Sequence, residues 1–241
     1  MTRIPIPWLG ADPEAPFPPL SRALREPNGL IAAGGDLDPR RLLNAYRRGI
    51  FPWFMPGEPI LWWTPDPRCV FATDAIHVAR RLRRVLARST WRVVADTRFE
   101  AIIDGCATAR RGGSGTWITD AMRDAYVGLH REGHAHSVEV LDGDRLVGGL
   151  YGVRVGALFC AESMFSAEAH GSKVALLALA RALAAEGVPL IDAQVASPHL
   201  ETLGARLMAR NDFARWCAVA GTLPEQPGFA TRIACAATDL A

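Results

Sequence analysis

The spacing of apolar and polar positions changes near residue 70. Before it, prolines, glycines and tryptophans interrupt each apolar run, and one segment alone has clear helical spacing. That segment has Asp38 as its N-cap and Pro39 in its first turn, and it ends at Gly49. Residues 49–57 hold too many breakers for a helix and are expected to form a shaped loop. We therefore predict a small irregular N-terminal domain over residues 1–70.

The rest of the chain, residues 71–241, has a mixed α/β pattern. Three consecutive strand-like segments, the first two separated by the hairpin signal Asp142-Gly143, predict a meander. A long helix and a further strand follow, which predicts a mixed sheet flanked by helices. The expected helices are 74–88, 99–109, one capped by Thr119 or Asp120 and running to 132, 172–185 and 211–220. The expected strands are 91–95, 136–141, 145–153, 157–164 and 189–195.

Composition places the chain among ordinary globular proteins. Of its 241 residues 49% are hydrophobic and 22% are charged, and no apolar run approaches the roughly 20 residues of a membrane helix. Residues 1–10 lack the apolar stretch of a signal peptide, so a cytoplasmic protein without membrane contact is expected, with a monomer as the default. The five cysteines contain no C-x-x-C pair, which favours free thiols.

The basic residues are unusual in kind and in placement. The net charge is only +2, but Lys173 is the single lysine among 27 basic residues. Arginine forms bidentate contacts with phosphate. Five arginines lie mostly outside the apolar stripe of the helix expected at 74–88 and are candidates for phosphate contacts: Arg80, Arg81, Arg83, Arg84 and Arg88.

Polar residues inside the last expected strand are the first candidates for chemistry. Asp192 and Gln194 are two apart, so both side chains should share one face, among apolar neighbours. Burying them is costly unless they are hydrogen-bonded. They either tie down a loop or position and help to deprotonate an attacking amine. Glu162 comes directly after the apolar run 158–161 and is a further candidate.

Two other motifs carry less weight. His134 and His136 have a spacing that can chelate zinc, but no cysteine or carboxylate lies close by in sequence, so structural histidines and a metal-free protein are expected. Residues 110–115 match the R-x-x-G-x-G phosphate loop of acetyl-CoA-dependent enzymes. That loop needs a strand before it, and here a helix is expected.

A series of motifs resembles the leucyl/phenylalanyl-tRNA–protein transferase family. The N-terminal ones are PNGLIAAGGD at 27–36, YRRGIFPWF at 46–54 and WWTPDPR at 62–68. Those that follow, in the family's order, are GTWIT at 115–119, GHAHS at 133–137, VGGLYG at 147–152, ESMFS at 162–166, SK at 172–173 and LIDAQ at 190–194. The match covers residues 25–215, with Gly171 and Leu141 as small departures.

The resemblance implies a C-terminal domain with the GCN5-related N-acetyltransferase fold that uses aminoacyl-tRNA instead of acetyl-CoA. The implied reaction moves leucine or phenylalanine, with methionine left open, to proteins with an N-terminal arginine or lysine. It marks them for N-end-rule degradation and needs no cofactor. An acetyl-CoA-dependent N-acetyltransferase and a non-catalytic RNA-binding module that uses the arginine helix are the alternatives.

The resemblance also implies the roles of particular residues. Asp192, Gln194 and Glu162 are the catalytic candidates, although the tRNA ribose hydroxyls are a competing source of proton transfer. Trp53 and Trp117 would hold the 3′-terminal adenosine of tRNA, with Tyr46 and Tyr126 adding polar contacts. The apolar pocket for the transferred amino acid would be formed by residues that ordinary core packing also explains: Leu150, Phe159, Met164, Leu176, Leu179 and Ile191.

Overall fold

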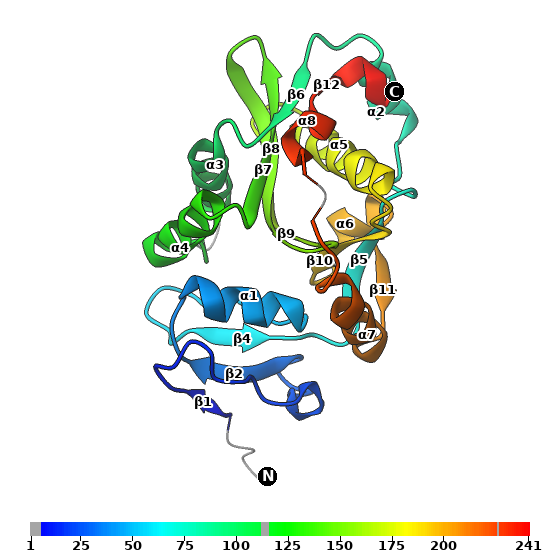
Figure 1. Cartoon of the computed structure of the whole chain (residues 1–241). Helices are drawn as coiled ribbons and strands as arrows, with labels where there is room; N and C mark the ends of the chain where they lie inside the picture. Colours follow the sequence, from blue (N-terminus) through cyan, green and yellow to red (C-terminus); the bar gives the residue numbers. More distant parts are fainter. Residues whose placement is uncertain (1–5, 112–115, 226) are drawn as a thin grey trace.

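The computed structural model describes residues 6–111, 116–225 and 227–241, apart from the side chains of residues 110 and 111 (Figure 1). In these residues an eight-stranded mixed sheet has the order β11-β5-β10-β9-β8-β7-β6-β12. Its strands are β5 (Arg68–Ala72), β6 (Arg92–Ala95), β7 (Ala135–Asp142), β8 (Arg145–Val155), β9 (Leu158–Ser166), β10 (Leu190–Gln194), β11 (Arg206–Met208) and β12 (Cys235–Ala236). The expected mixed α/β architecture is therefore confirmed.

A second, four-stranded sheet lies in the N-terminal region, where the sequence predicted irregular structure. Its order is β1-β2-β4-β3, formed by β1 (Trp8–Leu9), β2 (Leu30–Gly34), β3 (Phe51–Pro52) and β4 (Leu61–Trp63). The sequence missed it because these strands are short and contain proline or small residues. The division into two domains at residue 70 stays a prediction, and β5 of the large sheet begins at Arg68.

Helix α1 (Pro39–Arg47) lies between the two sheets (Figure 1). Its start is the predicted one, because the Asp38 side chain accepts a hydrogen bond from the Arg40 backbone N–H at 2.9 Å. Leu42, Ala45 and Tyr46 are completely buried on this helix. Tyr46 is thereby carried from the N-terminal region toward the large sheet.

The predicted meander β7-β8-β9 forms the centre of the large sheet, and Asp142 pairs with Arg145 across the predicted hairpin. Gly143 takes the left-handed φ of +60° that such a tight turn requires. Strand β10 then runs parallel to β9, but the register pairs only Ile191 with Phe159 and Asp192 with Cys160. Beyond these pairs the two strands are no longer hydrogen-bonded to each other.

Helices cover both faces of the large sheet. Helices α3 (Phe99–Arg111) and α4 (Asp120–Arg131) lie on one face, and α5 (Gly171–Ala185) lies on the other with the C-terminal elements (Figure 1). The α4 N-cap is Thr119, one of the two predicted residues. The remaining short elements are α6 (Pro198–Thr202), α7 (Arg210–Ala220), α8 (Phe229–Ile233), η1 (Leu20–Arg22) and η2 (Ala237–Leu240).

One predicted helix is much shorter than expected. Helix α2 spans Arg80–Leu86 instead of 74–88. The backbone N–H of His77 donates to the Leu203 carbonyl at 2.9 Å, and the N–H of Ala75 donates to Ala72 at 3.1 Å. These bonds tie residues 75–77 to the ends of β5 and α6, and the chain is not helical from Ala75 to Ala79.

No helix in the described ranges is both long and apolar enough to cross a membrane. Most of the R-x-x-G-x-G match, residues 112–115, and the first residue of the motif at 115–119 lie outside the described residues.

Candidate active site

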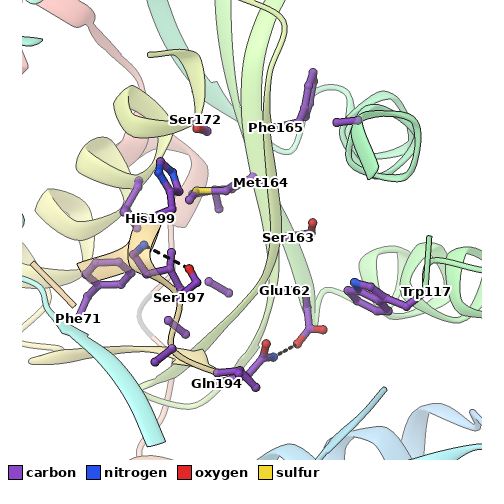
Figure 2. Close-up of a pocket in the computed structure, with 18 of the residues that line it drawn as sticks. Phe71, Trp117, Glu162, Ser163, Met164, Phe165, Ser172, Gln194, Ser197 and His199 are labelled. Atoms are coloured by element: carbon purple, nitrogen blue, oxygen red, sulfur yellow. Dashed lines mark hydrogen bonds between the residues drawn. The ribbon is translucent and has the colours of Figure 1, made fainter. Parts of the chain in front are cut away.

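A cavity of about 640 Å³ opens where β9 and β10 separate. Ala161 to Ser166 line it from one strand, and Ala193 to Ser197 line it from the other strand and the turn that follows (Figure 2). Parallel strands that diverge expose side chains and backbone groups which the sheet would otherwise cover. Both Glu162 and Gln194 are among the lining residues, so the structure brings two of the three catalytic candidates to one wall.

Part of the cavity lining is apolar. Leu150, Met164 and Leu176 line the cavity as predicted, and Phe71 and Leu200 join them. The sequence missed the last two because they come from β5 and α6, both too short to show a pattern. An apolar surface of this size suits a leucine- or phenylalanine-sized group.

The other three predicted pocket residues do not line the cavity. Phe159, Leu179 and Ile191 are completely buried in the core beneath α5. The ring of Phe159 stacks on Phe229 of the C-terminal segment, with centroids 5.9 Å apart. Leu179 lies one helical turn after Leu176 and hence deeper along α5. These three residues lie behind the cavity wall, and their place in the amino-acid pocket stays a prediction.

Glu162 is buried within β9, inside the strand expected at 157–164. It is only 7% exposed and holds three hydrogen-bonding partners. The Tyr46 hydroxyl donates to its Oε1 at 2.8 Å, the Tyr126 hydroxyl reaches its Oε2 at 2.9 Å, and Gln194 Nε2 donates to Oε1 at 2.7 Å. The two tyrosine oxygens also lie 2.6 Å apart. Glu162 and the two tyrosines therefore form a closed hydrogen-bonded triangle.

The triangle has a definite proton requirement. Three oxygen–oxygen contacts need three protons, and the Tyr46 and Tyr126 hydroxyls supply two. Both hydroxyls donate to Glu162, so the 2.6 Å contact between the two tyrosine oxygens has no proton of its own unless Glu162 contributes one. When Glu162 is ionised, one of the three contacts lacks a proton. The geometry thus favours the neutral carboxyl.

Electrostatics agree with this count. Burial raises the pKa of Glu162 from 4.5 to about 7, against the lowering effect of hydrogen bonds from Tyr46 and Tyr126. Burial, followed by the nearby Glu162 charge, raises the pKa of both tyrosines well above its usual value. Glu162 is therefore poised to exchange a proton near neutral pH.

The tyrosines lie where the resemblance places them, but their hydroxyls face Glu162. Both side chains are completely buried, and both hydroxyls are bonded to Glu162. In this structure they hold Glu162, and a contact with adenosine stays a prediction.

Asp192 and Gln194 have different partners. A bulge between them interrupts the strand alternation from which a common face was predicted. Asp192 is completely buried and paired with Arg68, while the Gln194 side chain reaches Glu162 and the cavity (Figure 2). The sequence missed Arg68, although an arginine directly before the apolar run 69–72 is a signal for a buried ion pair.

Trp53 and Trp117 both line the cavity, as their proposed role requires. Trp53 follows β3 and is 42% exposed, and its carbonyl accepts a hydrogen bond from the Trp63 indole N–H at 2.6 Å. Trp117 is partly buried just before the Thr119 cap of α4 (Figure 2). The two indoles come from segments far apart in sequence and give the cavity aromatic surfaces beside Glu162.

The five predicted arginines are exposed on and just after α2. Within the described residues none of Arg80, Arg81, Arg83, Arg84 and Arg88 forms an ion pair, so their charge is free to act on a partner. Burial is the main cause that lowers the pKa of His170, and the charges of Lys173 and Arg81 lower it further. Because Lys173 lines the cavity, positive charge extends from α2 to the cavity rim.

No group of three or more metal-binding side chains occurs in the described part of the chain. His136 instead bonds to the Asp96 carboxylate through Nδ1 at 2.7 Å, which gives it a structural partner. Ser172 and His199 also line the cavity, and sequence reasoning did not select either as a site residue.

Comparison with known proteins identifies close relatives. The family model of leucyl/phenylalanyl-tRNA protein transferase matches residues 70–218, and the model of that transferase's N-terminal domain matches residues 35–66. The leucyl/phenylalanyl-tRNA–protein transferase of Xanthomonas campestris pv. campestris (strain 8004) is 58% identical over 221 residues, which are 91% of this chain and 89% of that protein. That of Xylella fastidiosa (strain M12) is 62% identical over 199 residues, 82% of each chain.

Proposed function

The chain belongs to the leucyl/phenylalanyl-tRNA–protein transferase family, and we propose that its cavity moves leucine or phenylalanine from tRNA to proteins with an N-terminal arginine or lysine. The observation that carries this proposal is the arrangement of the cavity. An apolar part of the lining, two aromatic side chains and a buried proton-exchanging carboxyl meet in one space of about 640 Å³. The transfer marks the acceptor protein for N-end-rule degradation.

The donor would occupy the cavity in two parts. Its apolar side chain lies against Leu150, Met164 and Leu176, and its terminal adenosine lies against Trp53 and Trp117. Stacking on an aromatic side chain contributes about 1–3 kcal/mol per base. The ester carbonyl is thereby held beside Glu162 and Gln194.

The reaction needs one bond exchange and one proton transfer. The α-amine of the acceptor attacks the ester carbonyl, a C–N bond forms, the ester C–O bond breaks, and the ribose oxygen takes the proton. An α-ammonium has a pKa of about 7.7–8.0, so modest assistance is enough to expose its lone pair. Ionised Glu162 attracts the ammonium and accepts a proton, while Gln194 Oε1 accepts a hydrogen bond from the amine.

The wider architecture agrees with an acyltransferase. An antiparallel meander, a helical crossover and a parallel strand that separates from its neighbour support the GCN5-related N-acetyltransferase fold. Because the ester is already activated, we propose that the reaction uses no cofactor and no metal. We place the protein in the cytoplasm, where aminoacyl-tRNA is made, and as a monomer.

A reconstituted assay tests the proposal. Labelled Leu-tRNA or Phe-tRNA, the purified protein and a peptide that begins with Arg or Lys should give labelled peptide without ATP, and a peptide that begins with Ala should stay unlabelled. Labelling from acetyl-CoA would instead support an N-acetyltransferase. Binding of tRNA with no transfer to either peptide would support the RNA-binding alternative.

The arginines of α2 should bind the tRNA backbone. Replacing Arg80, Arg83 and Arg84 by alanine should weaken tRNA binding and reduce the slope of log affinity against log salt by about one per lost phosphate contact. Filter binding over a range of salt concentrations measures both quantities. Replacing Arg40, Arg145 and Arg215, which are exposed but ion-paired, is the control with the same change of charge. Equal effects of the two triple variants would show that only net charge matters.

A further inference from the structure

A buried ion pair lies directly behind Gln194. Arg68 begins β5 with a 1% exposed side chain, and Asp192 of β10 is completely buried. Arg68 Nε donates to Asp192 Oδ1 at 2.7 Å and its Nη2 donates to Oδ2 at 2.6 Å. Two parallel bonds of this kind use the planar fork of arginine, which lysine lacks.

The same guanidinium reaches the segment that carries Trp53. Its Nη1 donates to the Gly49 carbonyl at 3.0 Å, and its Cζ atom lies 4.8 Å from the Phe51 ring centroid. The ring centroid of Phe213, a residue of α7, lies 4.7 Å from the same Cζ atom. Phe51 lines the cavity and Trp53 follows two residues later. Arg68 thus joins β10 to the aromatic surface proposed for the adenosine.

Asp192 in turn holds the backbone of Gln194. The Gln194 N–H donates to Asp192 Oδ1 at 2.9 Å. Gln194 has a left-handed φ of +60°, which non-glycine residues seldom adopt, and β10 is bulged at this point. A backbone in this conformation keeps its geometry only when its surroundings fix it. The turned backbone is what directs the Gln194 amide to Glu162.

We propose that Arg68 is a positioning residue that sets Gln194 and the 49–53 segment in one geometry, with Asp192 as its anchor. Asp192 is then not the proton acceptor of the reaction, because it does not line the cavity and its protonation would break the buried pair with Arg68. The inference rests on the proposed function, since it assigns the proton transfer to Glu162.

The consequence for the reaction is geometric. The ester carbonyl has to lie between the adenosine surface and the Gln194 amide. A displacement of about 1 Å in such an arrangement lowers a rate by about 100-fold. A change at Arg68 therefore acts on the chemical step although its side chain does not line the cavity.

The test measures single-turnover transfer at saturating donor for Asp192→Asn, Arg68→Lys and the double variant Arg68→Lys/Asp192→Asn. Each single variant should lose about 10- to 100-fold in rate, and the double variant should be no worse than the poorer single one, because both changes break the same unit. The rate of Asp192→Asn should keep the pH inflection that belongs to Glu162. Loss of that inflection, or a wild-type rate in Arg68→Lys, would overturn the positioning role.

A second measurement does not depend on transfer. Hydrogen exchange should rise together in residues 49–53 and 192–196 of Asp192→Asn and Arg68→Lys, and it should stay unchanged in Arg145→Gln, which removes an exposed ion pair. A rise in one segment alone, or in neither, contradicts the joint positioning. A wild-type protein that fails to transfer refutes the proposed function, and the exchange result then decides the positioning by itself. Thermal melting identifies any variant that does not fold. If the double variant does not fold, the single variants Asp192→Asn and Arg68→Lys carry the test.

Discussion

Glu162→Gln should reduce the single-turnover rate of aminoacyl transfer by about 100-fold or more at pH values above 7, the range expected for loss of a positioned acid–base group. Glutamine reproduces the protonated form of Glu162. Its amide N–H can donate to Tyr126 while its oxygen accepts from Tyr46 and Gln194, so the contacts remain. The lost rate therefore reports the missing negative charge and proton acceptor.

The pH profile distinguishes this role from simple packing. Because the pKa of Glu162 is raised to about 7, the wild-type rate should increase as the pH rises through about 7. The variant should lose that inflection and keep only the one due to the acceptor amine. A variant that transfers at the wild-type rate would assign the proton transfer to the ribose hydroxyls, which a donor ending in 2′-deoxyadenosine tests directly.

Glu162→Gln should slow transfer but stabilise the folded protein at pH values above 7. Glu162 has a higher pKa in the folded chain than its ordinary 4.5, so the folded state binds the proton more tightly. Its stabilising contribution is complete below about 4.5 and is lost as the pH rises through about 7. Glutamine cannot ionise. Glu162→Gln should therefore melt at a higher temperature than the wild type at about pH 8 and at the same temperature near pH 4.5.

Trp117→Ala should weaken binding of an aminoacyl-adenosine analogue by about 5- to 150-fold, which corresponds to the loss of about 1–3 kcal/mol of stacking. Trp117 lines the cavity beside Glu162, whereas its neighbour Ile118 is buried in the core. Titration calorimetry with the analogue measures the change. At saturating donor the transfer rate should fall much less than the affinity, because a stacked ring acts on the bound donor before the amine attacks.

Two comparisons make this result specific. Trp8→Ala removes an indole that is 70% exposed and does not line the cavity, so it should leave binding unchanged. Trp53→Ala should resemble Trp117→Ala, because both side chains line the same cavity. Wild-type affinity in Trp117→Ala, with a normal melting temperature, would mean that the adenosine lies elsewhere.

Local signals in the sequence determined much of the fold. The caps Asp38 and Thr119 and the Asp142-Gly143 turn work through contacts within a few residues, so their positions were predicted correctly. The meander and α5 followed because their apolar patterns are long. Helix α2 was predicted too long, and the non-helical residues before it include His77, whose backbone N–H is bonded to Leu203, a partner more than a hundred residues away.

In the candidate site, too, the sequence identified some residues correctly and could not place others. The motifs selected Glu162, Gln194, Trp53 and Trp117, and all four line one cavity. Of the six residues predicted for the pocket, three line this cavity and three lie in the core, because an apolar side chain in the core and one at a cavity wall look alike in sequence. Leu176 lines the cavity and Leu179 does not, because Leu179 lies one turn further along α5.

Only the tertiary structure decided how the polar groups are paired. Glu162 meets Tyr46 from 116 residues away and Tyr126 from 36 residues away, and Arg68 meets Asp192 across 124 residues. A buried polar group must find a partner, but the sequence does not state which one. The folded chain supplies these partners where β9 and β10 separate, and that arrangement gives Glu162 a pKa of about 7 and anchors Asp192.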